Sequence, residues 1–188
     1  RPALESFSKW SKINPNRIIF AECDFEIDIG GIPWKGKIDR LEETPEGDLV
    51  IIDYKTGGKK KKIEKINESI QLNVYAIATN IEKEKDMPFG NKLPDGMSLK
   101  GKKVTHASFF YPEKDADGDP DPTTGKASGQ WFDYEITDED MANTKAKLEG
   151  YVESLRNGEF DATPGEYMPC KWCDFKDICP DSAATSAD

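Results

Sequence analysis

Hydrophobic and polar positions follow a helical spacing and then a strand-like pattern in the first part of the chain. Leu4, Phe7 and Trp10 are spaced as on one face of a helix, and the segment "NPN" at residues 14–16 then breaks that spacing. The following stretch "RIIFAECDFEIDIG", residues 17–30, is typical of a β-strand. We therefore expect a short helix that leads into a long strand.

Two apolar runs on either side of a polar turn predict a β-hairpin. These runs are "WKGKIDRLE" at residues 34–42 and "LVIIDYKTG" at residues 49–57, and "ETPEGD" between them contains the proline and glycine that favour a turn. A helix is predicted next, over residues 63–81. Its apolar stripe consists of Ile66, Ile70, Tyr75, Ala78 and Ile81.

The rest of the pattern predicts two more strands and a long helix. The strands are "VTHASFFYP" at residues 104–112 and "QWFDYEIT" at residues 130–137. The helix is expected to begin after Thr137 as N-cap and to end at Gly158. Its buried stripe would consist of Met141, Leu148, Val152 and Leu155. This alternation predicts an α/β fold with a central sheet flanked by helices.

Composition and charge narrow the class of protein. The chain has 188 residues, 26 basic and 36 acidic, and a formal net charge of -10. Such a balance argues against a simple nucleic-acid coating protein. The mean hydropathy of -0.71 and the lack of a long apolar run favour a cytoplasmic protein without a membrane segment. We expect a single domain over residues 1–180, lacking its N-terminal part, and a disordered tail over residues 181–188.

Asp39 and Asp53 each interrupt an otherwise apolar strand of the predicted hairpin. With the turn near Pro45 and Glu46, Asp39 faces Ile52 or Asp53, and Lys55 shares a face with Asp53. Two close carboxylates repel each other and one lysine neutralises a single charge, so a divalent cation, Mg²⁺ or Mn²⁺, is a natural further partner. The alternative is a set of ordinary surface salt bridges.

Gln71 and Tyr75 lie four residues apart in the predicted helix and therefore project from one face. That face can reach the two aspartates. A surface glutamine beside a half-buried tyrosine is the alternative interpretation.

The motifs "GKIDR", "DYKTG" and "QLNVY", in this order and spacing, resemble the core of the PD-(D/E)xK nucleases. The resemblance is to the RecB-like branch, which includes nuclease domains of recombination helicases and CRISPR-associated adaptation nucleases. It implies a restriction-endonuclease-like core with a central mixed sheet. It also implies a Mg-dependent exonuclease that acts on single-stranded DNA ends in recombination or repair, with a helicase domain or subunit as partner.

The resemblance also implies roles for individual residues. Asp39 and Asp53 would hold Mg²⁺ or Mn²⁺, Lys55 would orient the attacking water and stabilise charge, and Gln71 and Tyr75 would support the site. The alternative is a catalytically inactive DNA-binding or structural module with the same fold. The histidine that such nucleases carry upstream is missing. The chain's one histidine, His106, lies far downstream, and a structural role is expected for it.

Three cysteines near the C-terminus, Cys170, Cys173 and Cys179, have a spacing that suits zinc or an iron–sulfur cluster. "PCKWCDFKDICP" resembles the [4Fe-4S] staple of the same nuclease branch. Its fourth ligand is expected to be missing from this chain, which leaves the cluster labile or absent. Cys23 is the one spare cysteine, and three reduced thiols are the alternative.

A lysine run, Lys59, Lys60, Lys61 and Lys62, directly follows "DYKTGG". Its position beside the proposed site suits contacts with DNA phosphates, although a solvated loop is an equally good interpretation.

Overall fold

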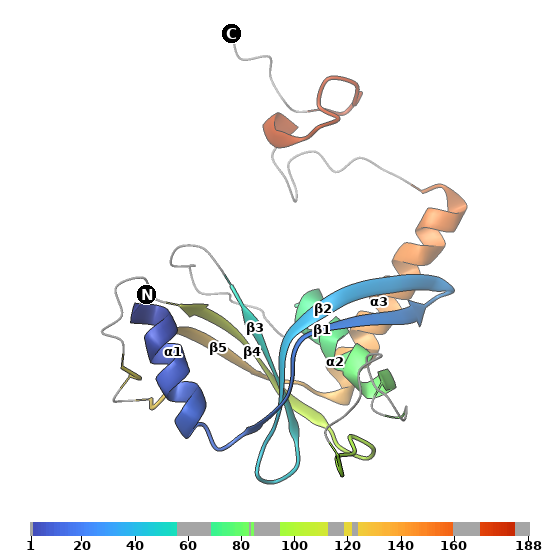
Figure 1. Cartoon of the computed structure of the whole chain (residues 1–188). Coiled ribbons are helices and arrows are strands. Elements are labelled where there is room, and N and C mark those ends of the chain that lie inside the picture. Colours follow the sequence, from blue (N-terminus) through green and yellow to red (C-terminus); the bar gives the residue numbers. More distant parts are fainter. Residues whose placement is uncertain are drawn as a thin grey trace. The chain divides into compact units, whose positions relative to one another are not determined.

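A mixed five-stranded β-sheet forms the centre of the first of two compact units, residues 1–149 (Figure 1). The computed structural model describes residues 2–55, 69–82, 84, 95–112, 119–121, 124–159 and 170–182. In chain order its elements are α1 (Pro2–Ile13), β1 (Arg17–Ile29), β2 (Ile32–Glu43), β3 (Leu49–Tyr54), α2 (Ile70–Glu82), β4 (Val104–Pro112), β5 (Gly129–Glu135), α3 (Asp138–Asn157) and the 3₁₀ turn η3 (Cys170–Trp172).

The strands lie side by side in their order along the chain, β1-β2-β3-β4-β5. Neighbouring strands are antiparallel except for β3 and β4, which are parallel. A parallel pair needs a long crossover, and α2 lies in the connection between these two strands. The predicted α/β class, with a central mixed sheet flanked by helices, is confirmed.

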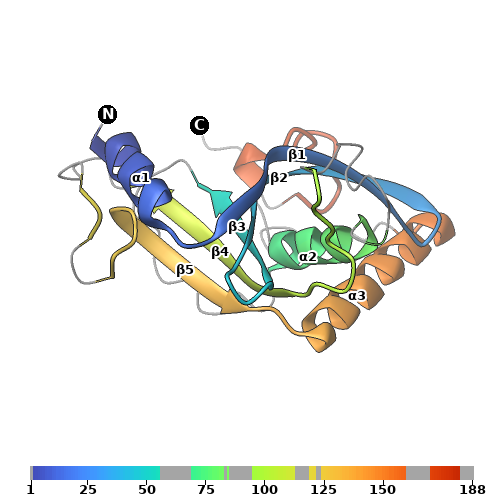
Figure 2. The same cartoon turned by 60° about the horizontal axis from the view of Figure 1, so that its bottom comes forward.

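The hairpin of β1 and β2 is long, and it passes over α2 in both views (Figures 1 and 2). Its turn is Gly30-Gly31, and both glycines have positive φ, 66° and 78°. Two such residues favour a tight type I′ hairpin turn, which glycine adopts without steric cost. Glu22 is the one described non-glycine residue with positive φ, 52°, and the register of β1 against β2 shifts nearby, between Ile18 and Phe20.

Each face of the sheet carries its own apolar core. Ile51 of β3 packs in the larger core with Leu72 and Ala76 of α2. Its neighbour Ile52 points the other way and packs with Trp10 of α1. Because successive strand residues face opposite sides, α1 and α2 cover opposite faces of the sheet.

The start of α3 agrees with the sequence prediction. Thr137 Oγ1 accepts a hydrogen bond from the backbone N–H of Asp140 at 3.1 Å, and Asp140 Oδ2 accepts one from the Thr137 N–H at 3.0 Å. This reciprocal pair satisfies two N–H groups that have no partner within the helix. At the other end Gly158 has φ 72°.

The prediction that Leu155 is buried is wrong, and Ile81, at the end of the predicted apolar stripe of α2, is also exposed. Ile81 of α2 is 40% exposed and Leu155 of α3 is 51% exposed, whereas Ala78 and Leu148, earlier in the same helices, are buried. Periodicity identifies the apolar face of a helix but not how far along the helix that face is covered.

The second compact unit, Gly150–Asp188, contains the end of α3 and the turns around η3. Within the described ranges, no helix is long and apolar enough to cross a membrane. Residues 63–68 of the predicted second helix, Lys59–Lys62, and residues 183–188 of the predicted tail lie outside the described residues.

Candidate active site

The two aspartates lie on adjacent antiparallel strands, as the hairpin count predicts. Arg40 pairs with Ile52 across β2 and β3, so one step further along this register Asp39 faces Asp53. Asp53 is 2% exposed, and Asp39 is half-buried. The backbone N–H of Tyr54 donates to Asp39 Oδ2 at 2.7 Å, which fixes that carboxylate against β3.

Gln71 of α2 joins the polar groups at this point of the sheet. Its Oε1 accepts a hydrogen bond from Lys55 Nζ at 2.7 Å. Its Nε2 donates to Asp53 Oδ1 at 3.0 Å and to the Tyr75 hydroxyl at 2.8 Å. An ammonium only donates and a carboxylate only accepts, so these partners determine which way the Gln71 amide points.

The second carboxylate oxygen of Asp53 is paired with Lys55. This atom, Oδ2, lies 2.6 Å from Lys55 Nζ as an ion pair, but it is buried and accepts no hydrogen bond of good geometry. Burial raises the pKa of the Asp53 carboxyl above its usual value of 3.8; Lys55 opposes that rise and Asp39 adds to it. A nearby cation would offset both the cost of burying the Asp53 charge and its repulsion by Asp39.

Tyr75 is held in place by the Phe25 ring, for which Gly36 leaves room. The Phe25 ring on β1 lies across Gly36 of β2, and a Cβ at that position would come within 2.6 Å of the ring. The same ring meets Tyr75 edge-on, with centroids 5.8 Å apart. Burial raises the pKa of the Tyr75 hydroxyl, which therefore stays protonated at neutral pH.

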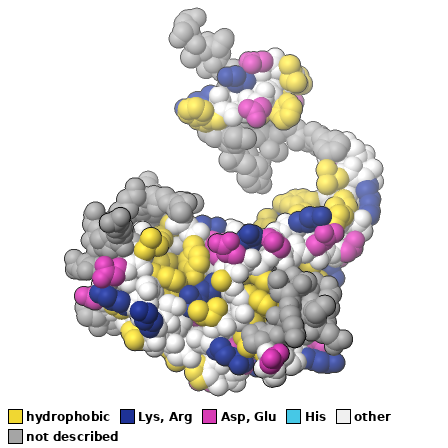
Figure 3. Space-filling view, in the orientation of Figure 1, with side chains coloured by type: hydrophobic (Ala, Val, Ile, Leu, Met, Phe, Trp, Pro, Cys, Tyr) yellow, Lys and Arg dark blue, Asp and Glu magenta, His cyan; other side chains and the backbone are white. Residues whose placement is uncertain are grey.

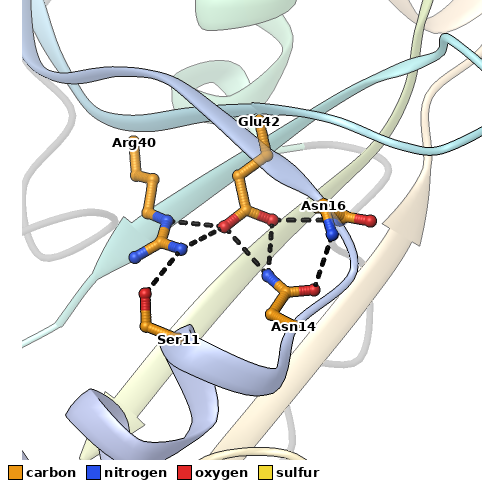
Figure 4. A network of polar contacts seen from close by, with 5 residues as sticks. All are labelled: Ser11, Asn14, Asn16, Arg40 and Glu42. Atoms are coloured by element: carbon orange, nitrogen blue, oxygen red, sulfur yellow. Dashed lines mark hydrogen bonds and ion pairs between the residues drawn. The ribbon is translucent and has the colours of Figure 1, made fainter.

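Figure 4 shows a buried polar network around Arg40 and Glu42 of β2. Because successive strand residues face opposite sides, this network lies on the other face of β2 from Asp39. Glu42 is fully buried and accepts hydrogen bonds from Arg40 Nε at 2.6 Å and from Asn14 Nδ2 at 3.0 and 3.1 Å. Asn16 and Ser11 complete the network through Glu42 and Arg40. It ties the end of α1 to the strand residue that follows Asp39.

Phe109 is a member of this site that sequence reasoning missed. It pairs with Asp53 in the parallel register of β3 and β4, and its ring centroid lies 4.7 Å from Lys55 Nζ. The apolar pattern of "VTHASFFYP" predicts that Phe109 is buried. It does not predict that Phe109 lies beside Asp53, because the two parallel strands are separated by a long connection and no local sequence signal marks their pairing.

His106 does not lie at this site, and the lysine run cannot be placed relative to it. His106 is exposed and lies on the other face of β4 from Phe109, with its Nδ1 3.1 Å from Thr105 Oγ1. Lys59–Lys62, in the lysine run, lie outside the described residues.

The predicted iron–sulfur ligands do not form a binding group where the structure describes them. No set of three or more His, Cys, Asp or Glu side chains in the described segments is arranged to hold a metal ion, and this covers Cys170, Cys173 and Cys179. Cys23 is 3% exposed and packs in the apolar core of the first unit. Among the described residues, the four cysteines are thus not gathered into a cluster-binding group.

Charges of both signs are interspersed on the described part of the molecule in the view of Figure 3. On the β1–β2 hairpin, for example, Lys35 pairs with Glu26 at 2.9 Å, and Lys37 lies 3.7 Å from Glu22. Basic side chains on this hairpin thus have acidic neighbours, which weakens any attraction for a phosphate backbone.

The fold and the motifs define the class of protein. The model of the PD-(D/E)XK nuclease superfamily matches residues 1–180, and the chain belongs to that superfamily. Its α/β sheet is consistent with the restriction-endonuclease-like fold that the motifs imply.

Solved structures that are similar to this chain include two crystal structures. The crystal structure of SSO0001 is 20% identical, with a TM-score of 0.43, over 85% of this chain and 58% of that one. A candidate exonuclease from Eubacterium rectale is 14% identical, with a TM-score of 0.39, over 92% of this chain and 52% of that one. The chain thus spans little more than half the length of either protein. No curated protein matches it.

Proposed function

We propose that this chain carries a divalent-metal-dependent nuclease site that hydrolyses DNA phosphodiester bonds. The observation that carries the proposal is the convergence of Asp39, Asp53, Lys55, Gln71 and Tyr75 at one point of the sheet. Membership of the nuclease superfamily supports it. The same five residues belong to the motifs that resemble the RecB-like branch.

The donor set suits Mg²⁺ or Mn²⁺. Mg²⁺ in phosphoryl-transfer sites is usually held by one or two carboxylates together with water and substrate phosphate, and Asp39 and Asp53 would supply these carboxylates. The buried Oδ2 of Asp53, whose one printed contact is the ion pair with Lys55, would be a ligand atom that the cation shares with that lysine. When bound, such a cation polarises the scissile phosphate and makes a water molecule a better nucleophile.

Three other residues would stabilise charge on the phosphate or position the groups that do so. Lys55 would place a positive charge where negative charge develops on the phosphate. Gln71 would hold Lys55 and Asp53 at a fixed separation, because its amide binds one of them at each end. The protonated Tyr75 hydroxyl would orient Gln71.

The finer assignment is part of the proposal. We infer an exonuclease that acts on single-stranded DNA ends in recombination or repair, together with a helicase domain or subunit. The resemblance of the three motifs to the RecB-like branch supports this inference.

The test is cleavage of end-labelled oligonucleotides by the wild-type chain and by Asp53→Asn. With Mg²⁺ or Mn²⁺ the wild type should shorten linear single strands from an end and leave circular single strands intact, and EDTA should stop the reaction. Asp53→Asn should lower the rate by about 10²- to 10⁴-fold. Asp24→Asn is the matched control, since Asp24 is an exposed carboxylate on the same sheet.

Two outcomes would contradict the proposed nuclease site, and a third would contradict the exonuclease assignment. Undiminished cleavage by folded Asp53→Asn would remove Asp53 from the site. DNA binding by the wild type without any cleavage would favour the alternative, a catalytically inactive binding module. Cutting of circular strands would keep the nuclease but refute the exonuclease assignment.

A further inference from the structure

Lys55 is held by three groups, and one of them is not polar. Its Nζ lies 2.6 Å from Asp53 Oδ2 and 2.7 Å from Gln71 Oε1. The third is the ring of Phe109, whose centroid is 4.7 Å from the same nitrogen. This distance is within the range in which the negative face of an aromatic ring attracts an ammonium group.

The backbone sets the position of that ring. Phe109 is the parallel-register partner of Asp53, and the backbone N–H of Lys55 donates to the carbonyl of the next residue, Phe110, at 2.8 Å. Phe109 is 5% exposed and belongs to the core shared by the sheet and α2. Its ring is therefore rigid, whereas the lysine side chain has a flexible four-carbon stem.

We propose that Phe109 is a positioning residue of the nuclease site, whose ring face holds the Lys55 ammonium against Asp53 and Gln71. The inference rests on the proposed function, because Lys55 placement matters only if Lys55 acts on the phosphate. Without the ring, the two oxygen acceptors would still bind Lys55, but the ammonium could swing toward solvent from a side chain that is already 27% exposed.

The decisive test changes the electrostatics of the ring while keeping its shape. Phenylalanines with one, two and three ring fluorines at position 109 weaken the ring's attraction for a cation stepwise. We expect kcat for DNA cleavage to fall with each fluorine, to a total of about 3- to 10-fold, with KM and the melting temperature nearly unchanged. Phe109→Leu should reach at least the same loss.

The matched control is the same fluorine series at Phe132. This residue on β5 is the cross-strand partner of Phe109 and is partly buried on the same core, and its ring meets Tyr111. Fluorination there should leave kcat unchanged. A kcat that stays flat across the series at position 109, or that falls equally at both positions, would show that Phe109 only packs in the core.

A second measurement does not depend on cleavage. In the NMR spectrum of the metal-free chain, the ε-methylene protons of Lys55 should be shifted upfield by the ring current of Phe109, and Phe109→Leu should abolish that shift. An ordinary chemical shift in the wild type would overturn the inference. If the wild type cuts no DNA, the proposed function fails, and the NMR result still decides whether Phe109 holds Lys55.

Discussion

Gln71 shows at the scale of one residue why the candidate site needs an amide. One side chain must accept a hydrogen bond from the Lys55 ammonium and donate one to the Asp53 carboxylate. A glutamate could not donate when ionised, and a methionine could do neither well. The amide therefore keeps the cation and the anion in place while it satisfies a hydrogen-bonding group on each.

The parts of the site that local geometry determines could be predicted from the sequence. Asp39 and Asp53 meet because the short connection between β2 and β3 fixes the register, and Gln71 and Tyr75 share a face because they are four residues apart in a helix. Phe109 could not be predicted, since its place beside Lys55 depends on strand pairing between distant parts of the chain. The catalytic and metal-binding roles of these residues stay predictions.

Gly36 gives a prediction at the same scale. Gly36→Ala places a methyl group 2.6 Å from the buried Phe25 ring, which must move and disturb its edge-on contact with Tyr75. We expect the free energy of unfolding to fall by about 1–3 kcal/mol and the cleavage rate to fall as well. Urea unfolding and the oligonucleotide assay measure the two effects.

Gly150→Ala in α3 is the contrasting control, because a Cβ there meets no atom within 4 Å. In a helix this change should leave the chain equally stable or stabilise it by up to about 1 kcal/mol. Equal stability of both variants would show that Phe25 adapts to a side chain at position 36.

At the scale of elements, α1 packs against a buried ion pair that lies within β2. Arg40 is 5% exposed, Glu42 is fully buried, and the Arg40 guanidinium lies 5.4 Å from the ring centroids of Phe7 and Trp10 on α1. Every polar contact of Glu42 in Figure 4 comes from a cation or an amide donor, so the charge is well compensated.

Removing one partner of this pair should be costly. Glu42→Ala leaves the Arg40 charge buried without its carboxylate, and we expect a loss of about 3–5 kcal/mol in the free energy of unfolding. Glu26→Ala, which removes a pair that is exposed on both sides, should cost about 0–1 kcal/mol. Similar losses in denaturant titrations of the two variants would contradict the structural role of the network.

Glu43 links three parts of the fold and gives a prediction about pH. It binds Lys102 and Arg17, and hydrogen bonding to Lys102 lowers its pKa below the usual value of 4.5 even though burial opposes the change. A lowered pKa in the folded state gives stability that is present above pH 4.5 and is lost as the pH falls through the folded pKa.

The variant Glu43→Gln should therefore be less stable than the wild type at pH 7, by about 1–2 kcal/mol. The difference should shrink as the pH falls below 4. Unfolding curves at pH 3 and pH 7 test this, and a difference that does not depend on pH would show that the carboxylate charge is not what stabilises the contact.

Strand identity could be predicted from alternation, and strand order only in part. The strands β1, β2 and β3 follow one another along the chain with short turns between them, so their pairing can be predicted. The parallel pairing of β3 with β4 depends on packing of α2 against the sheet, and no local pattern encodes it.

At the scale of the molecule, the site and the sheet belong to the first unit, whereas the cysteine segment belongs to the second. Backbone hydrogen bonds join residues within the segment 170–182, such as Cys179 N–H to Phe175 O at 2.9 Å. The prediction of a single domain over residues 1–180 stays a prediction.

A chain that ends after Glu159 tests how far the first unit depends on the rest. Because all five strands and all site residues are retained, we expect a cooperative thermal transition within a few degrees of the full chain and the same Mg²⁺-dependent cleavage. Circular dichroism melting and the oligonucleotide assay measure these properties. Loss of the cooperative transition would show that residues 160–188 contribute to the core of the first unit.

The parallel pairing of β3 with β4 also determines when the site can be completed during synthesis. The β2–β3 hairpin can close within about 1–10 μs of emerging, since its strands are neighbours. Phe109 leaves the ribosome more than fifty residues after Lys55, which takes several seconds at about 5–20 residues per second. Until β4 docks, the proposed lysine lacks one of its three supports, so a half-made chain should be a poor nuclease toward any DNA nearby.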